Sequence, residues 1–188
     1  MQKKEVIHLP IKLPFTMRII LVFFLFFTFP AFSQQLNKSE TIKYLNTRLS
    51  ETKELEIYYN ADRKYTISNT SFYESSKYKN KVVLSYTRNF LDGFVDQLEY
   101  IFDPLHISSL GTPPTTYNEA VGKMPITLIG QTLIVKQTTN GKIKYSDQNT
   151  VYFPFLRSEK LNTERVQKAF LHLKKLYQDT KPLDPFLN

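Results

Sequence analysis

The chain of 188 residues contains no cysteine and no tryptophan, and it has only five glycines and three histidines. The lack of cysteine excludes structural disulfides, thiol catalysis and cysteine-based zinc sites. So few glycines leave little room for glycine-rich phosphate-binding loops, and no G-x-S-x-G nucleophile motif is present. A domain without covalent cross-links needs a substantial packed core, which the 41% of hydrophobic residues can supply.

Few side chains suggest chemistry. Beyond the first 33 residues the histidines are His106 and His172, and neither has a second ligand at a metal-binding spacing. The acidic residues of the expected strands alternate with apolar residues, as on an outward strand face: Glu54, Glu56, Asp96 and Glu99. We therefore predict no catalytic, metal or cofactor site, and we interpret the chain as not an enzyme. A hydrolase whose residues converge only in three dimensions is a third alternative.

Residues 1–33 have the pattern of a cleavable secretory signal. Lysines and Arg18 precede an apolar run at 19–29, and Pro30 follows it. Small residues before the cut suit signal peptidase, so we expect cleavage between Ser33 and Gln34. The run would be roughly 16 Å long as a helix, which is too short for a bilayer core of roughly 30 Å. The pattern predicts an exported protein, periplasmic or secreted, without a transmembrane span after cleavage.

The leader also affects the start and the charge of the chain. Met17 and Arg18 begin a compact signal by themselves, so residues 1–16 are interpreted as a mis-called start or a long basic region. The leader holds four basic residues and one acidic residue, and its removal lowers the formal net charge from +8 to +5. This charge is not a dense basic stripe, and export separates the protein from nucleic acid, so we predict no nucleic-acid partner.

The mature region, 34–188, is predicted to form one α+β domain. Helical spacing of apolar residues indicates a short amphipathic helix over about 39–51, with Ser39 as its N-cap. Six or seven strands follow, marked by alternating apolar residues, and Asn140-Gly141 predicts a hairpin turn. The segment 125–136 is expected to form a bent strand or two strands, with Gly130 at the kink, and Pro154 confines the last strand to a sheet edge or a strand end.

The clearest helix closes the chain. Val166, Phe170, Leu173 and Tyr177 form one apolar stripe, and Asn162 or Thr163 is expected to cap the helix. The stripe has to be buried, so the helix is predicted to cover a face or an open end of the sheet. Short loops between consecutive strands favour an antiparallel meander. The predicted fold is an antiparallel sheet or partly open barrel capped by this C-terminal helix.

A run of strands that ends in one amphipathic helix resembles the pleckstrin-homology-like superfold. More specifically, the chain resembles a group of exported proteins of gram-negative bacteria that have no known activity. The resembling segments are Val151-Tyr152-Phe153-Pro154-Phe155, the helix at 164–173, Asp184-Pro185-Phe186, Phe32-Ser33-Gln34 and the helix at 40–46. The resemblance implies a PH-like roll and export, and it implies no activity.

Tyrosine is the most distinctive residue of the mature region. Seven tyrosines fall on expected strands: Tyr58, Tyr59, Tyr65, Tyr86, Tyr100, Tyr145 and Tyr152. Tyrosine suits both core filling and binding faces, because its ring is apolar and its tip is polar. We expect Tyr58 to be an exposed contact. The segment 108–123 has no clear period and is expected to be a long loop, so Pro113, Pro114 and Tyr117 are further candidates for a binding surface.

We interpret the chain as a non-catalytic binding or interaction domain of the cell envelope, whose partner is another envelope protein. The alternative is a carrier that holds a small apolar ligand in a partly closed barrel. A cavity of several hundred Å³ lined by tyrosine and phenylalanine would favour the carrier. A filled interior with an exposed tyrosine-bearing edge would favour the interaction domain.

Overall fold

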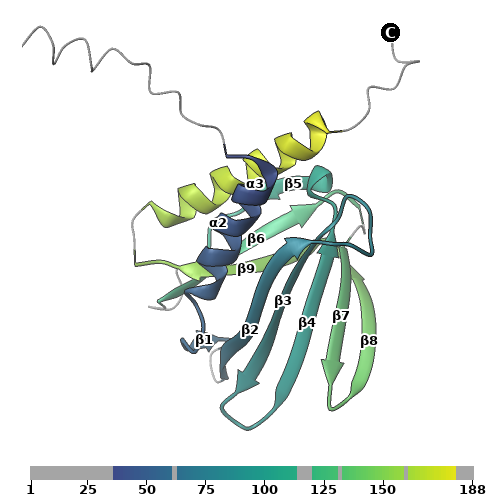
Figure 1. The fold of residues 1–188 in the computed structure, drawn as a ribbon. Helices are drawn as coiled ribbons and strands as arrows, with labels where there is room; N and C mark the ends of the chain where they lie inside the picture. Colours follow the sequence, from purple (N-terminus) through teal and green to yellow (C-terminus); the bar gives the residue numbers. More distant parts are fainter. Residues whose placement is uncertain (1–35, 61–62, 114–119, 131–132, 159–160, 181–188) are drawn as a thin grey trace, which may run out of the picture. The chain divides into compact units, whose positions relative to one another are not determined.

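A computed structural model describes residues 36–60, 63–113, 120–130, 133–158 and 161–180. These residues form two antiparallel sheets and two α-helices (Figure 1). The leader, including the expected cleavage site at Ser33 and Gln34, lies outside the described residues. The α+β class and the antiparallel pairing predicted from the sequence are confirmed.

The larger sheet, sheet A, has six strands in the order β1-β2-β3-β4-β7-β8. Its strands are β1 (Ile57–Tyr58), β2 (Lys64–Glu74), β3 (Val82–Phe90), β4 (Val95–Phe102), β7 (Leu133–Thr139) and β8 (Lys142–Gln148). The smaller sheet, sheet B, has the order β5-β6-β9, with β5 (Ile107–Leu110), β6 (Val121–Leu128) and β9 (Thr150–Leu156). A short 3-10 turn, η1 (Pro104–His106), separates β4 from β5.

The expected meander of consecutive strands is wrong at three connections, because β4 and β5, β6 and β7, and β8 and β9 do not pair with each other. β4 pairs with β7 rather than with β5, because β5 and β6 leave sheet A and form most of sheet B. The segment around Gly130 forms two strands, as one of the two expected alternatives had it, and they belong to two different sheets. Gly130 has a φ of +66°, a backbone conformation that glycine adopts without the steric cost of a side chain.

Two turn predictions are confirmed. Asn140 and Gly141 both have positive φ, and they join β7 to β8 as a tight hairpin turn. Pro154 lies in β9, which is an edge strand of sheet B, so its missing N–H interrupts no central ladder. In contrast, the loop expected over 108–123 is shorter, because β5 extends to Leu110 and β6 begins at Val121.

The two helices are α2 (Lys38–Ser50) and α3 (Asn162–Asp179). Both helices were predicted from the sequence, but the predicted N-cap residues are wrong. Asn37, not Ser39, caps α2, and its side chain forms a reciprocal capping box with Glu40. In α3 the N-cap position is Leu161. Asn162 lies inside the helix, where its side-chain amide donates to the carbonyl oxygen of Leu156 at 2.9 Å.

The apolar stripe of α3 is buried, as predicted. Val166, Phe170 and Leu173 are fully buried, and α3 lies across one end of the strands of sheet A (Figure 1). The ring of Phe170 lies edge-on to Phe153 of β9 at 5.1 Å and to Phe72 of β2 at 5.7 Å. One helix residue thus joins the two sheets, and edge-on ring pairs add to the free energy of burial.

We predict that Phe170→Ala lowers the free energy of unfolding by about 3–5 kcal/mol, because it leaves a cavity where two sheets and a helix meet. Leu171→Ala is the matched control on the same helix, since Leu171 is 56% exposed. It should change stability by less than about 0.5 kcal/mol. Urea unfolding followed by circular dichroism measures both values, and similar losses in the two variants would contradict the packing described.

Candidate functional site

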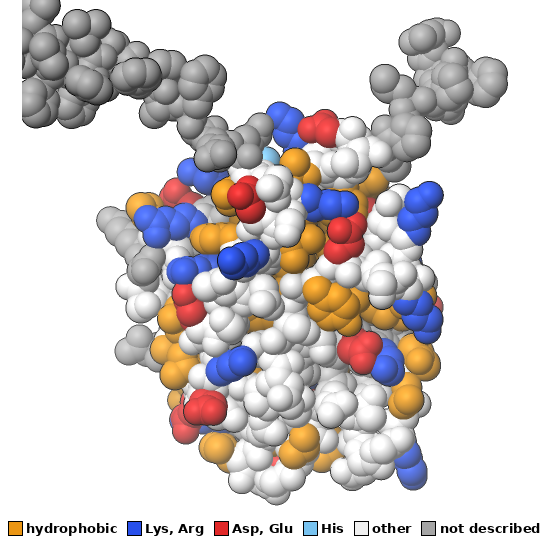
Figure 2. Space-filling model, viewed as in Figure 1, with side chains coloured by type: hydrophobic (Ala, Val, Ile, Leu, Met, Phe, Trp, Pro, Cys, Tyr) orange, Lys and Arg blue, Asp and Glu red, His pale blue; other side chains and the backbone are white. Residues whose placement is uncertain are grey.

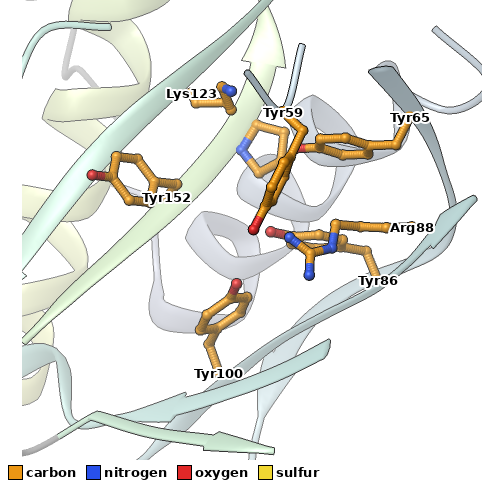
Figure 3. Close-up of a pocket in the computed structure, with 8 residues that line it drawn as sticks. Tyr59, Tyr65, Tyr86, Arg88, Tyr100, Lys123 and Tyr152 are labelled. Carbon is orange, nitrogen blue, oxygen red and sulfur yellow. The ribbon is translucent and has the colours of Figure 1, made fainter. Parts of the chain in front are cut away.

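A pocket of about 530 Å³ lies between the two sheets. Its described lining consists of five tyrosines, two cations and a proline: Tyr59, Tyr65, Tyr86, Arg88, Tyr100, Lys123, Tyr152 and Pro154. In Figure 3 the hydroxyl groups of Tyr59, Tyr86 and Tyr100 point into the same region, beside the guanidinium of Arg88. Sites of this size accommodate small organic molecules.

Sheet A supplies one wall through the alternation of its strands. Tyr86 and Arg88 are two residues apart on β3 and so project to the same face. The register aligns Arg88 with Asp96 and Leu84 with Tyr100 across the β3–β4 pair. On the same face of β3, the fully buried Leu84 comes before Tyr86 and Arg88.

Sheet B supplies the opposite wall. Lys123 of β6 is aligned with Pro154 of β9, and Tyr152 lies two residues before Pro154 on the same face. The ammonium group of Lys123 donates a hydrogen bond to the backbone oxygen of Tyr58. This bond connects sheet B to β1, which precedes the pocket residue Tyr59.

Arg88 is held in place by Asp96. Its Nε donates to one carboxylate oxygen at 2.8 Å and its Nη2 to the other at 2.6 Å. Gln137 of β7 donates a further hydrogen bond to Asp96 at 2.8 Å. The Asp96 side chain is 1% exposed and that of Arg88 is 15% exposed. The expectation that Asp96 faces outward is therefore wrong, because the residue pairs with Arg88 on the inner face.

Aromatic rings surround the guanidinium as well. Its Cζ lies 5.4 Å from the ring centroid of Tyr59, 5.8 Å from that of Tyr65 and 5.4 Å from that of Phe90. Such distances allow cation–π attraction. Burial lowers the pKa of Arg88, but the hydrogen bonds and charge of Asp96 raise it by more, so the net shift is upward. The guanidinium therefore stays charged throughout the physiological range.

The phenol groups of Tyr86 and Tyr100 stay protonated at neutral pH. Burial, assisted by the neighbouring Tyr100 and Tyr65, raises the pKa of Tyr86 well above the ordinary value of 10.0. Burial also raises the pKa of Tyr100, although a hydrogen bond with Tyr86 and the charge of Arg88 oppose the shift. Their rings lie 5.9 Å apart. At neutral pH these phenols are hydrogen-bond donors and are poor general bases.

Of the surface candidates from the sequence, Tyr58 and Pro113 are not among the described lining residues of this pocket. Tyr58 is half-buried in β1, and the ammonium of Lys64 lies 4.7 Å from its ring centroid. Pro113 is buried, and Pro114 and Tyr117 lie outside the described residues. Five of the seven strand tyrosines noted in the sequence do line the pocket. Neither Arg88 nor Lys123 was singled out, since nothing in their local sequence distinguishes them from surface cations.

The two histidines lie apart from the pocket lining. His106 belongs to η1, and its buried Nδ1 has no hydrogen-bond partner among the described residues. His172 of α3 contacts the backbone oxygen of Leu36 through Nε2. Within the described parts of the chain, no group of three metal-ligating side chains comes together. The same residues include no helix long and apolar enough to cross a membrane.

Comparisons with protein-family models, with curated proteins and with solved structures find no match to this chain. The function therefore has to be argued from the site itself.

We predict that Arg88→Ala lowers the free energy of unfolding by about 3–5 kcal/mol, because it leaves the buried Asp96 charge without its partner. Lys136→Ala is the control. Lys136 pairs with Glu99 at 2.7 Å, but the two side chains are 28% and 35% exposed, and such a pair contributes about 0–1 kcal/mol. Chemical denaturation distinguishes the two variants. If the free energy of unfolding fell by the same small amount in both variants, the buried Asp96 would not need Arg88 as its partner, and the prediction would be wrong.

Stability should fall at alkaline pH. A phenol whose pKa is higher in the folded state than in the unfolded state contributes stability below the unfolded pKa, about 10, and loses it as pH rises toward the folded pKa. Tyr86→Phe removes the ionisable group and should flatten this decline. Unfolding measured from neutral pH to pH values above 10 tests the effect, and an unchanged slope in the variant would contradict the assignment to Tyr86.

Proposed function

We propose that this chain is a non-catalytic binding protein that holds a small organic molecule in the tyrosine-lined pocket. The observation that carries the proposal is the pocket of about 530 Å³ between the sheets, with five tyrosines on its walls. Its volume and its aromatic lining are those expected of a carrier. The lining is not purely apolar, however, because Arg88 and Lys123 belong to it. The carrier alternative considered from the sequence assumed an apolar ligand. Because of these two cations, we propose instead a ligand that also carries polar groups.

The chemistry of the lining supports binding rather than catalysis. The described lining residues are tyrosines, cations and a proline, without a carboxylate or a histidine among them. Arg88 stays protonated, and the pKa values of the buried Tyr86 and the half-buried Tyr100 are raised. These groups donate hydrogen bonds and do not readily accept protons at neutral pH.

We further propose that the protein acts in the periplasm or outside the cell. This proposal rests on the leader pattern at 1–33. The PH-like roll likewise remains a proposal. It is supported by the antiparallel sheets and the terminal helix, while the exchange of β5 and β6 into sheet B is a departure from a simple meander.

Docking of another envelope protein is a second candidate function. Tyr73, Ile143 and Tyr145 are 44%, 55% and 63% exposed, and they lie on the face of sheet A opposite the pocket. On the face shown in Figure 2, hydrophobic side chains are interspersed with charged side chains and form no single broad patch. Large contiguous apolar patches mark many protein-binding surfaces. The pocket is therefore the better supported site.

The binding proposal predicts that a library of small aromatic molecules, screened by ligand-observed NMR, contains compounds that compete for one site. Tyr152→Ala should weaken their binding about tenfold. The loss of one ring contact costs on the order of 1 kcal/mol, and about 1.4 kcal/mol corresponds to a tenfold change in Kd. Tyr145→Ala is the matched control, because Tyr145 is also an exposed strand tyrosine but lies away from the pocket. Absence of any competing compound, or equal effects of the two variants, would count against the proposal.

A further inference from the structure

Three phenol groups meet inside the pocket. The hydroxyl groups of Tyr59, Tyr86 and Tyr100 point into the same region in Figure 3 and form a hydroxyl cluster. Each phenol O–H can both donate and accept a hydrogen bond. Because burial raises the pKa of Tyr86 and of Tyr100, these two groups remain uncharged at neutral pH. A ligand that reaches this region therefore meets groups that act as donors and as acceptors.

The charged residues of the described lining already have partners. Asp96 accepts two hydrogen bonds from the guanidinium of Arg88, at 2.8 and 2.6 Å, and its side chain is 1% exposed. The ammonium of Lys123 donates to the backbone oxygen of Tyr58, and in Figure 3 it lies away from the hydroxyl cluster. An anion at the cluster would be repelled by Asp96, and a cation by Arg88. Either ion would lose its hydration without meeting an unpaired counter-ion among the described lining residues.

The phenol groups favour a ligand that is polar as well as uncharged. An apolar ligand would displace water from the hydroxyl cluster and leave its hydrogen bonds unmade, which lowers the affinity. A hydroxyl group on the ligand avoids this loss, because it donates and accepts hydrogen bonds as a phenol does. A carbonyl group, in contrast, only accepts. The hydroxyl cluster is therefore best matched by hydroxyl groups on the ligand.

Tyrosine rings on both walls indicate the rest of the ligand. Tyr152 comes from β9 of sheet B, whereas Tyr65 and Tyr86 come from β2 and β3 of sheet A. Tyr59 and Tyr152 are 51% and 50% exposed, while Tyr65 and Tyr86 are each 4% exposed. Aromatic surface thus extends from the outer part of the pocket to its interior. A flat aromatic ring packs against such surfaces in offset or edge-on contacts.

We propose that the ligand of this pocket is an uncharged aromatic compound that carries hydroxyl groups. Its ring lies between the tyrosine rings of the two sheets, and its hydroxyl groups exchange hydrogen bonds with the hydroxyl cluster. The Arg88–Asp96 pair forms a part of the wall that has no net charge. This inference rests on the proposed binding function and specifies the chemistry that the site selects.

Naphthalene probes of similar shape test the inference: 2-naphthol, the apolar 2-methylnaphthalene, the anion 2-naphthoate and the cation 2-naphthylmethylammonium. Fluorescence titration at neutral pH should give the lowest Kd for 2-naphthol. The apolar probe should bind about threefold or more weakly, because it leaves the phenol groups without hydrogen bonds. Both ions should bind about tenfold or more weakly, since the pocket does not compensate for their lost hydration.

Variants locate the effect at the hydroxyl cluster. The double variant Tyr86→Phe/Tyr100→Phe removes two hydroxyl groups and keeps both rings. It should weaken 2-naphthol binding about tenfold while weakening 2-methylnaphthalene binding less than about twofold, because only 2-naphthol exchanges hydrogen bonds with these phenols. Tyr145→Phe is the matched control and should leave both affinities unchanged, since Tyr145 is 63% exposed and is not among the described lining residues.

A second measurement does not depend on the variants. Circular dichroism verifies that each variant is folded. If the double variant does not fold, NMR of the unaltered protein gives the test, through the signals of the tyrosine Cζ atoms that carry the hydroxyl groups. The signals of Tyr86 and Tyr100 should shift on addition of 2-naphthol, and that of Tyr145 should not.

Each other outcome counts against a defined part of the proposal. If either ion binds in the pocket as tightly as 2-naphthol, the uncharged assignment is wrong and the binding function stands. If 2-methylnaphthalene binds as tightly as 2-naphthol, or if the double variant weakens both equally, the hydroxyl assignment fails. If no probe binds, or if binding is unaffected by Tyr152→Ala and by the double variant and leaves the Tyr86 and Tyr100 signals unshifted, both the inference and the proposed function are overturned.

Discussion

The edge-on contacts of Phe72, Phe153 and Phe170 are the interaction on which the rest of the molecule depends. They bring a strand of each sheet and the terminal helix to one point, so the two sheets approach each other from there. Burial of these rings excludes water from that end of the interior. The pocket between the sheets is lined by tyrosines of β2 and β9, the strands of Phe72 and Phe153, and by Arg88 of β3.

The pocket combines two requirements that usually conflict. A charged group near a core needs a partner, and a binding site needs donors that are not already satisfied. In Arg88, Asp96 occupies one edge of the guanidinium, and the residue also belongs to the described lining of the pocket. Asp96 is itself supported by Gln137, so the charged pair is hydrogen-bonded on the side away from solvent. The pocket lining thus includes a charged group whose position is fixed by hydrogen bonds.

Much of the architecture could be predicted from local patterns. The stripe led by Val166 and Phe170, the Asn140-Gly141 turn and the edge position of Pro154 each follow from a rule that involves only neighbouring residues. The prediction failed where a distant partner decides the outcome. Asp96 alternates with apolar residues just as a surface carboxylate does, and its burial depends on Arg88 of the adjacent strand. Local periodicity likewise does not predict that β5 and β6 belong to a second sheet.

The sequence by itself determined the α+β class, the burial of the terminal helix and the exclusion of disulfide and thiol chemistry, because composition and short-range spacing carry that information. It also showed that tyrosines gather on strands. Only the tertiary structure decided which of them share a pocket, that Arg88 and Lys123 join them, and that Tyr145 does not. Strand register and the pairing of two sheets set these relations, and both arise from contacts between residues far apart in the chain.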